Sequence, residues 1–185
     1  GLAQLAQRFY PALRYDVICN GIDTETFYPA AERRFSGRLK LLTVCRLIER
    51  KRIDLLIEAL AELVRNGTDA ELTIVGHGNL EAELKVLARA LNLTDRVCFR
   101  GLVEYEHLAS IYREHHIFLM SSLHEGMSNA MLEAMACGLP IVTTACEGSE
   151  ELVSGNGVVV ERPDARAIAQ AVRGLLDKPD TRAQM

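Results

Sequence analysis

The 185-residue sequence lacks the features that mark membrane-spanning and secreted proteins. Tryptophan is absent, and no uninterrupted apolar run approaches the roughly 20 residues that a membrane helix needs. The start has no basic region leading into a hydrophobic stretch, so it does not resemble a signal peptide. The chain starts at Gly1 rather than at methionine and stops at Met185. We therefore expect a globular piece of a longer protein, without a membrane span in this piece.

The sequence also lacks paired cysteine motifs. Its cysteines are odd in number, scattered and never in C-x-x-C spacing. Such usage fits reduced thiols in a cytoplasmic protein better than a disulfide framework. We expect each of them to be a small buried apolar residue rather than a ligand or a nucleophile. The five are Cys19, Cys45, Cys98, Cys137 and Cys146.

Basic charge is not in excess either. The formal net charge is −4, whereas a general nucleic-acid binder normally presents a basic face, so we expect no nucleic-acid partner. Apolar residues make up 49% of the chain and charged residues 25%, the profile of a globular protein. The length suffices for one well-packed domain and is too short for two ordinary ones.

Several catalytic and cofactor motifs are missing. The sequence contains no G-x-S-x-G, Walker A or H-E-x-x-H. The two histidines at 115–116 have no third ligand at metal spacing, which favours a structural role. The G-x-G at 76–78 follows the second expected strand, and Glu81 stands where a dinucleotide fingerprint needs a third glycine, so an NAD-dependent enzyme is disfavoured. We interpret these glycines as a tight strand-to-helix turn that skirts a ligand, with Gly76 as a candidate contact.

From residue 39 onward, short apolar runs alternate with amphipathic segments. Apolar residues at helical spacing predict the helices. Strands that are apolar on both faces and alternate with helices indicate a parallel sheet covered on both sides. We predict an α/β fold with a doubly wound, Rossmann-like parallel sheet. Strands are expected at 39–44, 72–75, 97–99, 117–120, 140–143 and 158–160, and helices at 54–66, 79–91, 104–114, 128–137 and 164–177.

The first 36 residues do not follow this alternation, and their last part is polar without periodicity. We interpret residues 1–36 as an interdomain segment or the remnant of a preceding domain, and 37–185 as one domain. The elements expected in the first part are a helix at 2–10, a short strand at 15–18 and a turn at 20–23.

A basic cluster follows the first expected strand. Arg46 and Lys51 belong to a seven-residue stretch that carries four cations in an otherwise acidic chain. A fork-shaped guanidinium and a point-charge ammonium together suit a diphosphate. Taken alone, the cluster could equally be a solvated loop before a helix.

A second candidate runs from the loop after the fourth strand into a helix, over residues 125–133. Gly126 and Ser128 permit a tight approach, and the free N–H groups at a helix start form an anion site. Glu133 lies among apolar neighbours, which predicts a buried carboxylate that needs a partner, such as a pair of sugar hydroxyls. The alternative is an ordinary helix start capped by Ser128, with Glu133 exposed.

The expected topology brings these two candidates together. In a doubly wound sheet of order 3-2-1-4-5-6, strands one and four are neighbours at the switch point where such folds bind ligands. A glycosidase pair is disfavoured, because eight helical residues place Glu125 and Glu133 about 12 Å apart. Glycosidase carboxylates lie roughly 5–9.5 Å apart.

These residues resemble the C-terminal domain of the retaining GT-B glycosyltransferases of family four, the glycosyl transferases group 1. The resemblance extends over 39–177, with a weaker echo at 20–27. Its most specific part is Glu125-x7-Glu133 followed by the run A-M-A-C-G-L-P-I-V at 134–142. Other family positions occur in the family's order: Arg46…Lys51, 75–78, 97–101 and Asn156-Gly157.

The resemblance implies a role for each candidate. Arg46 and Lys51 would bind the diphosphate of a nucleotide-sugar donor and stabilise it as leaving group, and Glu125 would bind the donor sugar near its anomeric carbon. Glu133 would bind the ribose hydroxyls. The base would lie against the backbone after the third strand, and backbone N–H groups at the helix start would hold phosphate or sugar oxygens. These two sets are Leu102 and Val103, and Gly126, Met127, Ser128, Asn129 and Ala130.

The resemblance further implies transfer with retention from a UDP-, GDP- or ADP-sugar to a glycan, lipid or small-molecule acceptor, as in polysaccharide biosynthesis. Two cations and a helix start already neutralise a diphosphate, so we expect no metal or other cofactor. A missing N-terminal half would supply the acceptor site, and this piece alone would bind donor without turnover. We expect it in the cytoplasm, with any contact to the inner face of the membrane made through the missing half.

Two other functions remain open, a nucleotide-binding module without catalysis and a GT-B nucleotide-sugar epimerase. The chain also departs from the family pattern. Cys45 and Arg52 stand where the family has glycine, which questions a close backbone approach at Cys45 and offers an extra cation at Arg52. Met127 replaces a commoner aromatic or aliphatic residue and would alter the sugar pocket.

Overall fold

The computed structural model describes residues 2–12, 14, 16, 18–31 and 37–177. Its centre is a six-stranded parallel sheet of order β3-β2-β1-β4-β5-β6. The doubly wound α/β fold and the strand order expected from the sequence are therefore confirmed. The strands are β1 (Leu39–Val44), β2 (Ala70–Val75), β3 (Val97–Gly101), β4 (Ile117–Met120), β5 (Ile141–Thr144) and β6 (Gly157–Val160).

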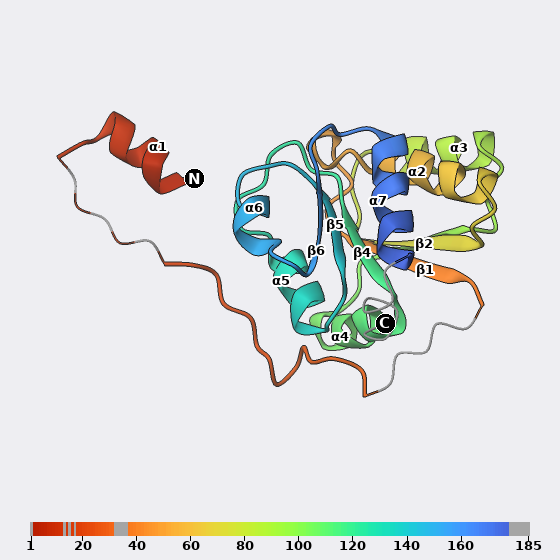
Figure 1. The fold of residues 1–185 in the computed structure, drawn as a ribbon, viewed down its shortest axis with the longest axis horizontal. Helices are drawn as coiled ribbons and strands as arrows, with labels where there is room; N and C mark the ends of the chain where they lie inside the picture. Colours follow the sequence, from red (N-terminus) through yellow and green to blue (C-terminus); the bar gives the residue numbers. More distant parts are fainter. Residues whose placement is uncertain (1, 13, 15, 17, 32–36, 178–185) are drawn as a thin grey trace.

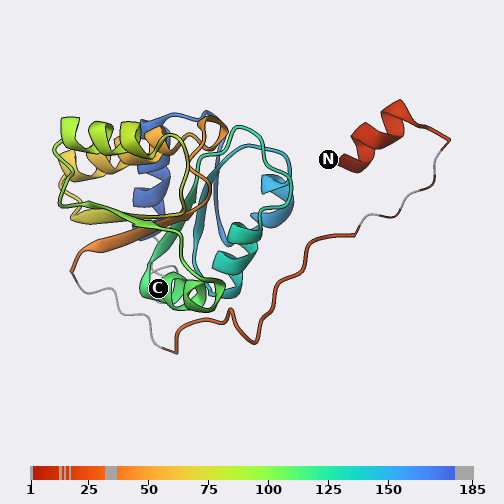
Figure 2. The same cartoon turned by 180° about the vertical axis from the view of Figure 1, so that it is seen from behind.

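Helices cover both faces of this sheet (Figures 1 and 2). Neighbouring strand residues point to opposite faces, so Leu41 joins one core and Leu42 the other. The first core contains α2 (Ile53–Arg65), α3 (Glu81–Ala90) and α7 (Ala165–Leu176). The second contains α4 (Tyr105–Glu114) and α5 (Asn129–Ala136), with α6 (Ser149–Leu152) beside them.

Helix ends lie within two residues of those expected, because local side chains set them. Asp164 caps α7 by accepting a hydrogen bond from the N–H of Ala167 at 2.8 Å. Asn66 and Gly67 end α2, with Gly67 at φ +83°. The sequence analysis missed the short helix α6 and η1, the 3-10 turn Glu49–Lys51.

The segment before the sheet differs in part from expectation. The helix α1 (Leu2–Phe9) is present and lies apart from the sheet (Figures 1 and 2). Half of the strand expected at 15–18 falls outside the described residues, and Asp16 and Ile18 are not in a strand. The expected turn at 20–23 lies later, where Asp23 accepts hydrogen bonds from the N–H of Glu25 and the hydroxyl of Thr26.

Part of this segment packs on the sheet domain. It runs along α5 and α4 (Figure 1), and Phe27 is fully buried in the second core. The ring of Phe27 meets those of Tyr105 and Tyr112 edge-on, at centroid distances of 5.3 and 5.9 Å. The packed unit therefore extends in front of residue 37, where the domain was expected to begin.

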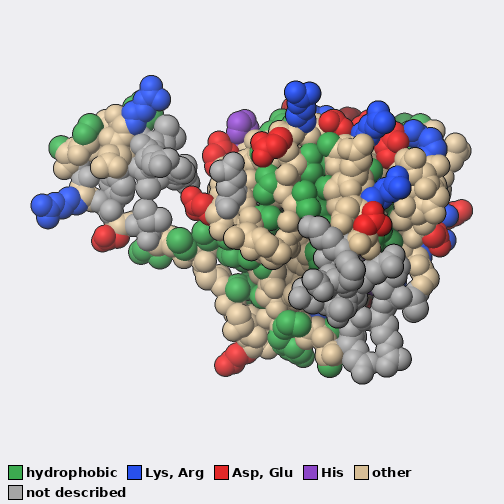
Figure 3. All heavy atoms as spheres, in the orientation of Figure 1, with side chains coloured by type: hydrophobic (Ala, Val, Ile, Leu, Met, Phe, Trp, Pro, Cys, Tyr) green, Lys and Arg blue, Asp and Glu red, His purple; other side chains and the backbone are tan. Residues whose placement is uncertain are grey.

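Strand β6 lies at one edge of the sheet. Its residues Gly157, Val158 and Val159 are only partly buried, whereas every residue of β4 and β5 is buried. In Figure 3 apolar side chains show between α6 and α7, and charged side chains of both signs gather over α2 and α7. This polar helix face is the one that amphipathic spacing predicts.

Candidate functional site

The loops after β1 and β4 are fastened to each other at the carboxyl edge of the sheet. The hydroxyl of Ser121 donates to the backbone oxygens of Lys51 and Arg52, at 2.7 and 2.8 Å. The N–H of Leu123 donates to the backbone oxygen of Arg50 at 2.9 Å. The meeting of the two candidate segments, expected from the strand order, is therefore observed.

Lys51 and Glu125 form an ion pair across this junction. The ammonium of Lys51 donates to Oε2 of Glu125, and their side chains are 11% and 17% exposed. Partial burial strengthens a charge pair relative to one in water. The pair therefore places a cation and a carboxylate, each with a role expected from the sequence, in direct contact at the mouth of the crevice.

The remaining cations of the basic cluster differ in their surroundings. Arg46 is exposed in the loop directly after β1. Arg52, expected to offer an extra cation, binds the carboxylate of Asp54 through Nε and Nη2, the latter at 2.8 Å. Arg52 also adopts a left-handed backbone conformation with φ +47°. Lys51 and Arg46 are thus the cations best placed for a ligand at this edge.

Helix α5 starts at the same edge. Ser128 caps it, and its Oγ accepts a hydrogen bond from the N–H of Met131 at 3.4 Å. The first N–H groups of a helix have no partners within the helix, and the helix dipole favours an anion beside them. Gly148 closes over the preceding loop, because a Cβ on it would lie 2.6 Å from the backbone oxygen of Gly126.

Glu133 lies one turn into α5 and is 8% exposed, which confirms the expectation of a buried carboxylate. Its Oε2 accepts a hydrogen bond from the Tyr112 hydroxyl at 2.8 Å. Burial raises the pKa of Glu133, and the Tyr112 bond opposes that shift. The sequence analysis missed Tyr112 because it belongs to α4 and carries no motif.

Asn20 is a second residue that the sequence analysis did not single out. Its Nδ2 donates to the backbone oxygen of Met127 at 3.2 Å and to Oδ1 of Asn129 at 2.8 Å. The early segment thereby contacts the loop that leads into α5. The only signal in the sequence was the weak family echo at 20–27.

The glycines after β2 are required by packing. Gly76 has φ +124°, and a Cβ on it would lie 1.9 Å from the backbone oxygen of Cys45. A Cβ on Gly78 would lie 2.2 Å from the backbone oxygen of Leu47. The loop after β2 therefore presses on the loop after β1, with Cys45 at the close approach. The expected contact of Gly76 with a ligand stays a prediction.

Leu102 and Val103 follow β3 at the same edge. Leu102 is 73% exposed, and Val103 packs partly against the second core. The N–H of Gly76 donates to the backbone oxygen of Gly101 at 2.7 Å, which ties this loop to the one after β2. The expected contact of Leu102 and Val103 with the base stays a prediction.

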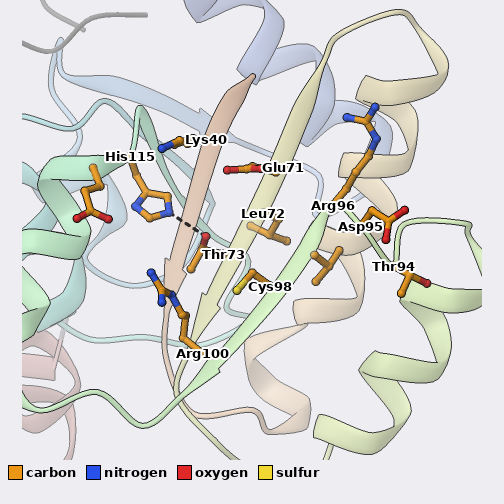
Figure 4. A pocket seen from close by; sticks show the side chains of 12 residues that line it. Lys40, Glu71, Leu72, Thr73, Thr94, Asp95, Arg96, Cys98, Arg100 and His115 are labelled. Atoms are coloured by element: carbon orange, nitrogen blue, oxygen red, sulfur yellow. Dashed lines mark hydrogen bonds between the residues drawn. The ribbon is translucent and has the colours of Figure 1, made fainter. Parts of the chain in front are cut away.

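A separate hollow of about 410 Å³ lies mainly at the amino ends of the strands (Figure 4). Its lining mixes both charges, and His115 lies in it with Nε2 2.8 Å from the hydroxyl of Thr73. Burial lowers the pKa of His115. His116 Nδ1 accepts the N–H of Lys40 at 2.9 Å, so the expected structural role of both histidines is confirmed. Doubly wound sheets bind ligands at the opposite, carboxyl edge.

The cysteines correct one expectation. All five are free thiols, but only Cys137 is buried, while Cys19 and Cys98 are exposed. Within the described residues, no group of three or more His, Cys, Asp or Glu could hold a metal ion. No helix in the same part of the chain is long and apolar enough to cross a membrane.

The doubly wound sheet, with a charged carboxyl edge and a helix start facing it, defines a Rossmann-like ligand-binding domain. Comparison with known protein families is more specific, because residues 24–185 match the family described as Glycosyl transferases group 1. The chain belongs to this family. Its structural neighbours are GT-B glycosyltransferases, in agreement with the fold expected from the sequence.

Individual relatives show how much of a complete protein the chain represents. It is 36% identical over 167 residues to the amylovoran biosynthesis glycosyltransferase AmsK of Erwinia amylovora, covering 86% of the chain and 41% of that protein. It is 32% identical over 158 residues to a colanic acid biosynthesis glycosyltransferase, WcaL, of Escherichia coli, covering 81% and 39%. The structure of sucrose-phosphate synthase from Thermosynechococcus elongatus matches with a TM-score of 0.85 and 28% identity, covering 98% and 49%. The chain thus spans less than half the length of each.

Proposed function

We propose that the chain is the donor-binding half of a retaining glycosyltransferase that moves a sugar from a UDP-, GDP- or ADP-sugar to an acceptor. The observation that carries the proposal is the junction of the β1 and β4 loops, where Lys51, Glu125 and the start of α5 meet. Membership of the family supports the transferase activity. Retention rests on the family resemblance.

Lys51 and Arg46 bind the donor diphosphate in this proposal. The N–H groups at the start of α5, from Gly126 to Ala130, donate to phosphate or sugar oxygens on the other side. Together they stabilise the diphosphate as it departs, which is electrostatic catalysis by groups already in place. Two cations and a helix dipole supply the positive charge, so the proposed mechanism needs no metal ion.

Glu125 changes partner in the proposed complex. It now neutralises Lys51, and a diphosphate would take over that cation. The freed carboxylate can then accept hydrogen bonds from hydroxyls of the donor sugar. Glu133, buried one turn into α5, binds the ribose hydroxyls, and the base lies against Leu102 and Val103.

The acceptor is proposed to bind to a half that the matched relatives have beyond this chain. One relative is by name an amylovoran biosynthesis enzyme and another a phosphatidylinositol monomannoside mannosyltransferase, so acceptors in the family differ. A glycan, lipid or small molecule is accordingly proposed here. We place the protein in the cytoplasm, in line with its five free thiols. This chain alone would bind donor and turn over little.

Product analysis of the full-length protein tests the proposal. Incubation with UDP-glucose, GDP-mannose and ADP-glucose, followed by NMR of the anomeric protons, should show one donor consumed and the α-anomer formed first. The same assay on the 185-residue chain should show little product. Release of the β-anomer would contradict retention. An epimerised sugar, or binding without any turnover by the full-length protein, would support the epimerase or the non-catalytic module instead.

A further inference from the structure

The hydroxyl of Tyr112 reaches from α4 to the carboxylate on α5. The side chain of Tyr112 is fully buried, and its Oη donates to Oε2 of Glu133 at 2.8 Å. A buried phenol needs an acceptor and a buried carboxylate needs donors, so the bond satisfies both groups. It also commits one of the two oxygens of Glu133 to a fixed direction.

Aromatic packing holds the ring of Tyr112 in place. Phe27 meets it edge-on at 5.9 Å with an interplanar angle of 71°, and Phe118 lies against it at 6.0 Å. Phe27 is 0% and Phe118 1% exposed, so neither ring can swing into solvent without opening the core. The hydroxyl is therefore aimed at Glu133 before any ligand arrives, which is the preorganisation that precise binding requires.

We propose that Tyr112 is a positioning residue for nucleotide recognition, holding one oxygen of Glu133 so that the carboxylate is oriented to accept the ribose hydroxyls. The inference rests on the ribose-binding role proposed above for Glu133. Without the phenol the carboxylate can rotate about its terminal torsion, which is broad for glutamate. The geometry needed for both ribose hydroxyls is then held less tightly.

The same bond influences the pH range of binding. Burial raises the pKa of Glu133, and the Tyr112 hydroxyl counteracts this by stabilising the ionised form. Cys137 on α5 and Cys45 after β1 are the other titratable groups acting on the tyrosine, and burial raises the pKa of Cys45 to about 11. Removal of the hydroxyl leaves burial unopposed. Glu133 then takes up a proton at a higher pH, and a protonated carboxyl is a poorer acceptor for ribose.

The test compares Tyr112→Phe with Tyr28→Phe. The second change removes a hydroxyl from a half-exposed ring that stacks on Arg113, away from Glu133. Each variant and the unchanged chain are titrated calorimetrically with UDP, GDP and ADP, and with the 2′-deoxy form of each. The measured quantities are the ratio of ribose to deoxyribose affinity and the pH at which affinity falls by half.

We expect the unchanged chain to prefer the ribose form by about tenfold or more, the size of a hydrogen bond to a charged group. Tyr112→Phe should reduce this preference by about threefold or more and move the half-affinity pH upward, whereas Tyr28→Phe should change neither. Incorporation of 3-fluorotyrosine at 112 keeps the ring shape and strengthens the donor. It should move the half-affinity pH downward, and it provides a test even if Tyr112→Phe does not fold.

An unchanged preference and pH profile in Tyr112→Phe, or in the fluorotyrosine variant, would overturn the inference while leaving the proposed function intact. Failure of the unchanged chain to prefer ribose would also overturn it. Failure of all three nucleotides to bind the unchanged chain and the full-length protein would count against the proposed function itself, and the inference would fall with it.

Discussion

Glu133 carries a carboxylate into an apolar helix, where the phenol of Tyr112 meets one of its oxygens. Its pKa is raised by burial, so the folded chain binds more protons than the unfolded chain between the ordinary and the raised pKa. Stability therefore decreases as the pH rises through that interval, and the loss is absent below the ordinary value near 4.5. The site keeps an ionisable group where a neutral one would be more stable.

Glu133→Gln should accordingly stabilise the chain at pH 7 while it weakens nucleotide binding. Glutamine keeps an acceptor for the Tyr112 hydroxyl and avoids burial of a charge. The advantage should shrink as the pH falls toward 4.5, where Glu133 is increasingly protonated in both states. Urea unfolding midpoints across this range measure the effect, with Glu161→Gln on an exposed residue as control. A variant that is equally destabilised at every pH would contradict the expectation.

At the residue scale, the sequence predicted side chains whose signal is local. Glu133 was expected to be buried because its neighbours along the helix are apolar, and Ser128 and Asp164 were expected as caps because they precede helices. Tyr112 and Asn20 were missed because their partners lie 21 and 107–109 residues away. Such contacts depend on how helices and segments pack, which periodicity does not encode.

At the element scale, the site depends on loops that press against one another at the carboxyl edge. The loop after β2 needs Gly76 because its backbone has φ +124° and passes close to Cys45. The family resemblance raised a doubt about the close approach at Cys45, and the structure shows that the approach is made by the glycine opposite it. The shape of the β1 loop, and so the place of Lys51, rests on this contact.

Gly76→Ala should destabilise the chain by roughly 2–4 kcal/mol, because backbone strain and a steric clash add. Gly174→Ala is the matched control. Gly174 lies inside α7 with no atom within 4 Å of an added Cβ, so alanine there should stabilise by about 0.5–1 kcal/mol. Thermal or urea unfolding of the two variants should show opposite signs. A neutral Gly76→Ala would mean that the loop has an alternative path.

Most elements could be predicted from the alternation of apolar runs and amphipathic segments, and their ends from Gly, Asn and Asp. The helix α6 and the turn η1 could not be predicted, because four and three residues are too few to show periodicity. The elements were therefore predictable where they span several turns or a buried strand. The loops that build the site were predictable only in position, not in shape.

At the scale of the whole molecule, the segment before the sheet belongs to its packing. Phe27 is fully buried between α4 and the sheet, and Asn20 bonds the loop that leads into α5. Movements of this segment would therefore reach both Tyr112 and the start of α5. The domain boundary expected at 36 was placed by loss of the strand–helix alternation, which does not register a buried aromatic in an irregular segment.

Phe27→Ala should destabilise the chain by roughly 3–5 kcal/mol, as large core truncations do. Ile18→Ala, at a side chain that is 90% exposed in the same segment, should change stability by less than about 0.5 kcal/mol. Urea unfolding compares the two. If Phe27→Ala is as mild as Ile18→Ala, the segment does not pack on the domain in solution.

The strand order and the meeting of the β1 and β4 loops were predictable because doubly wound sheets obey general rules of topology. The direct pairing of Lys51 with Glu125 was not, since the family resemblance assigns the two to different parts of one donor. Both observations lead to the same central claim. The carboxyl edge of this sheet is a site for a nucleoside diphosphate.

Calorimetric titration of the chain and of the full-length protein with UDP, GDP and ADP tests that claim most directly. We expect one of them to bind, and Lys51→Ala to weaken it about 10- to 100-fold, the value of a hydrogen bond between charged groups. The loss should diminish at high salt, the free nucleoside should be unaffected, and Lys85→Ala on the surface of α3 should bind as the unchanged chain does. No binding to either protein, or equal affinity in Lys51→Ala, would contradict the account.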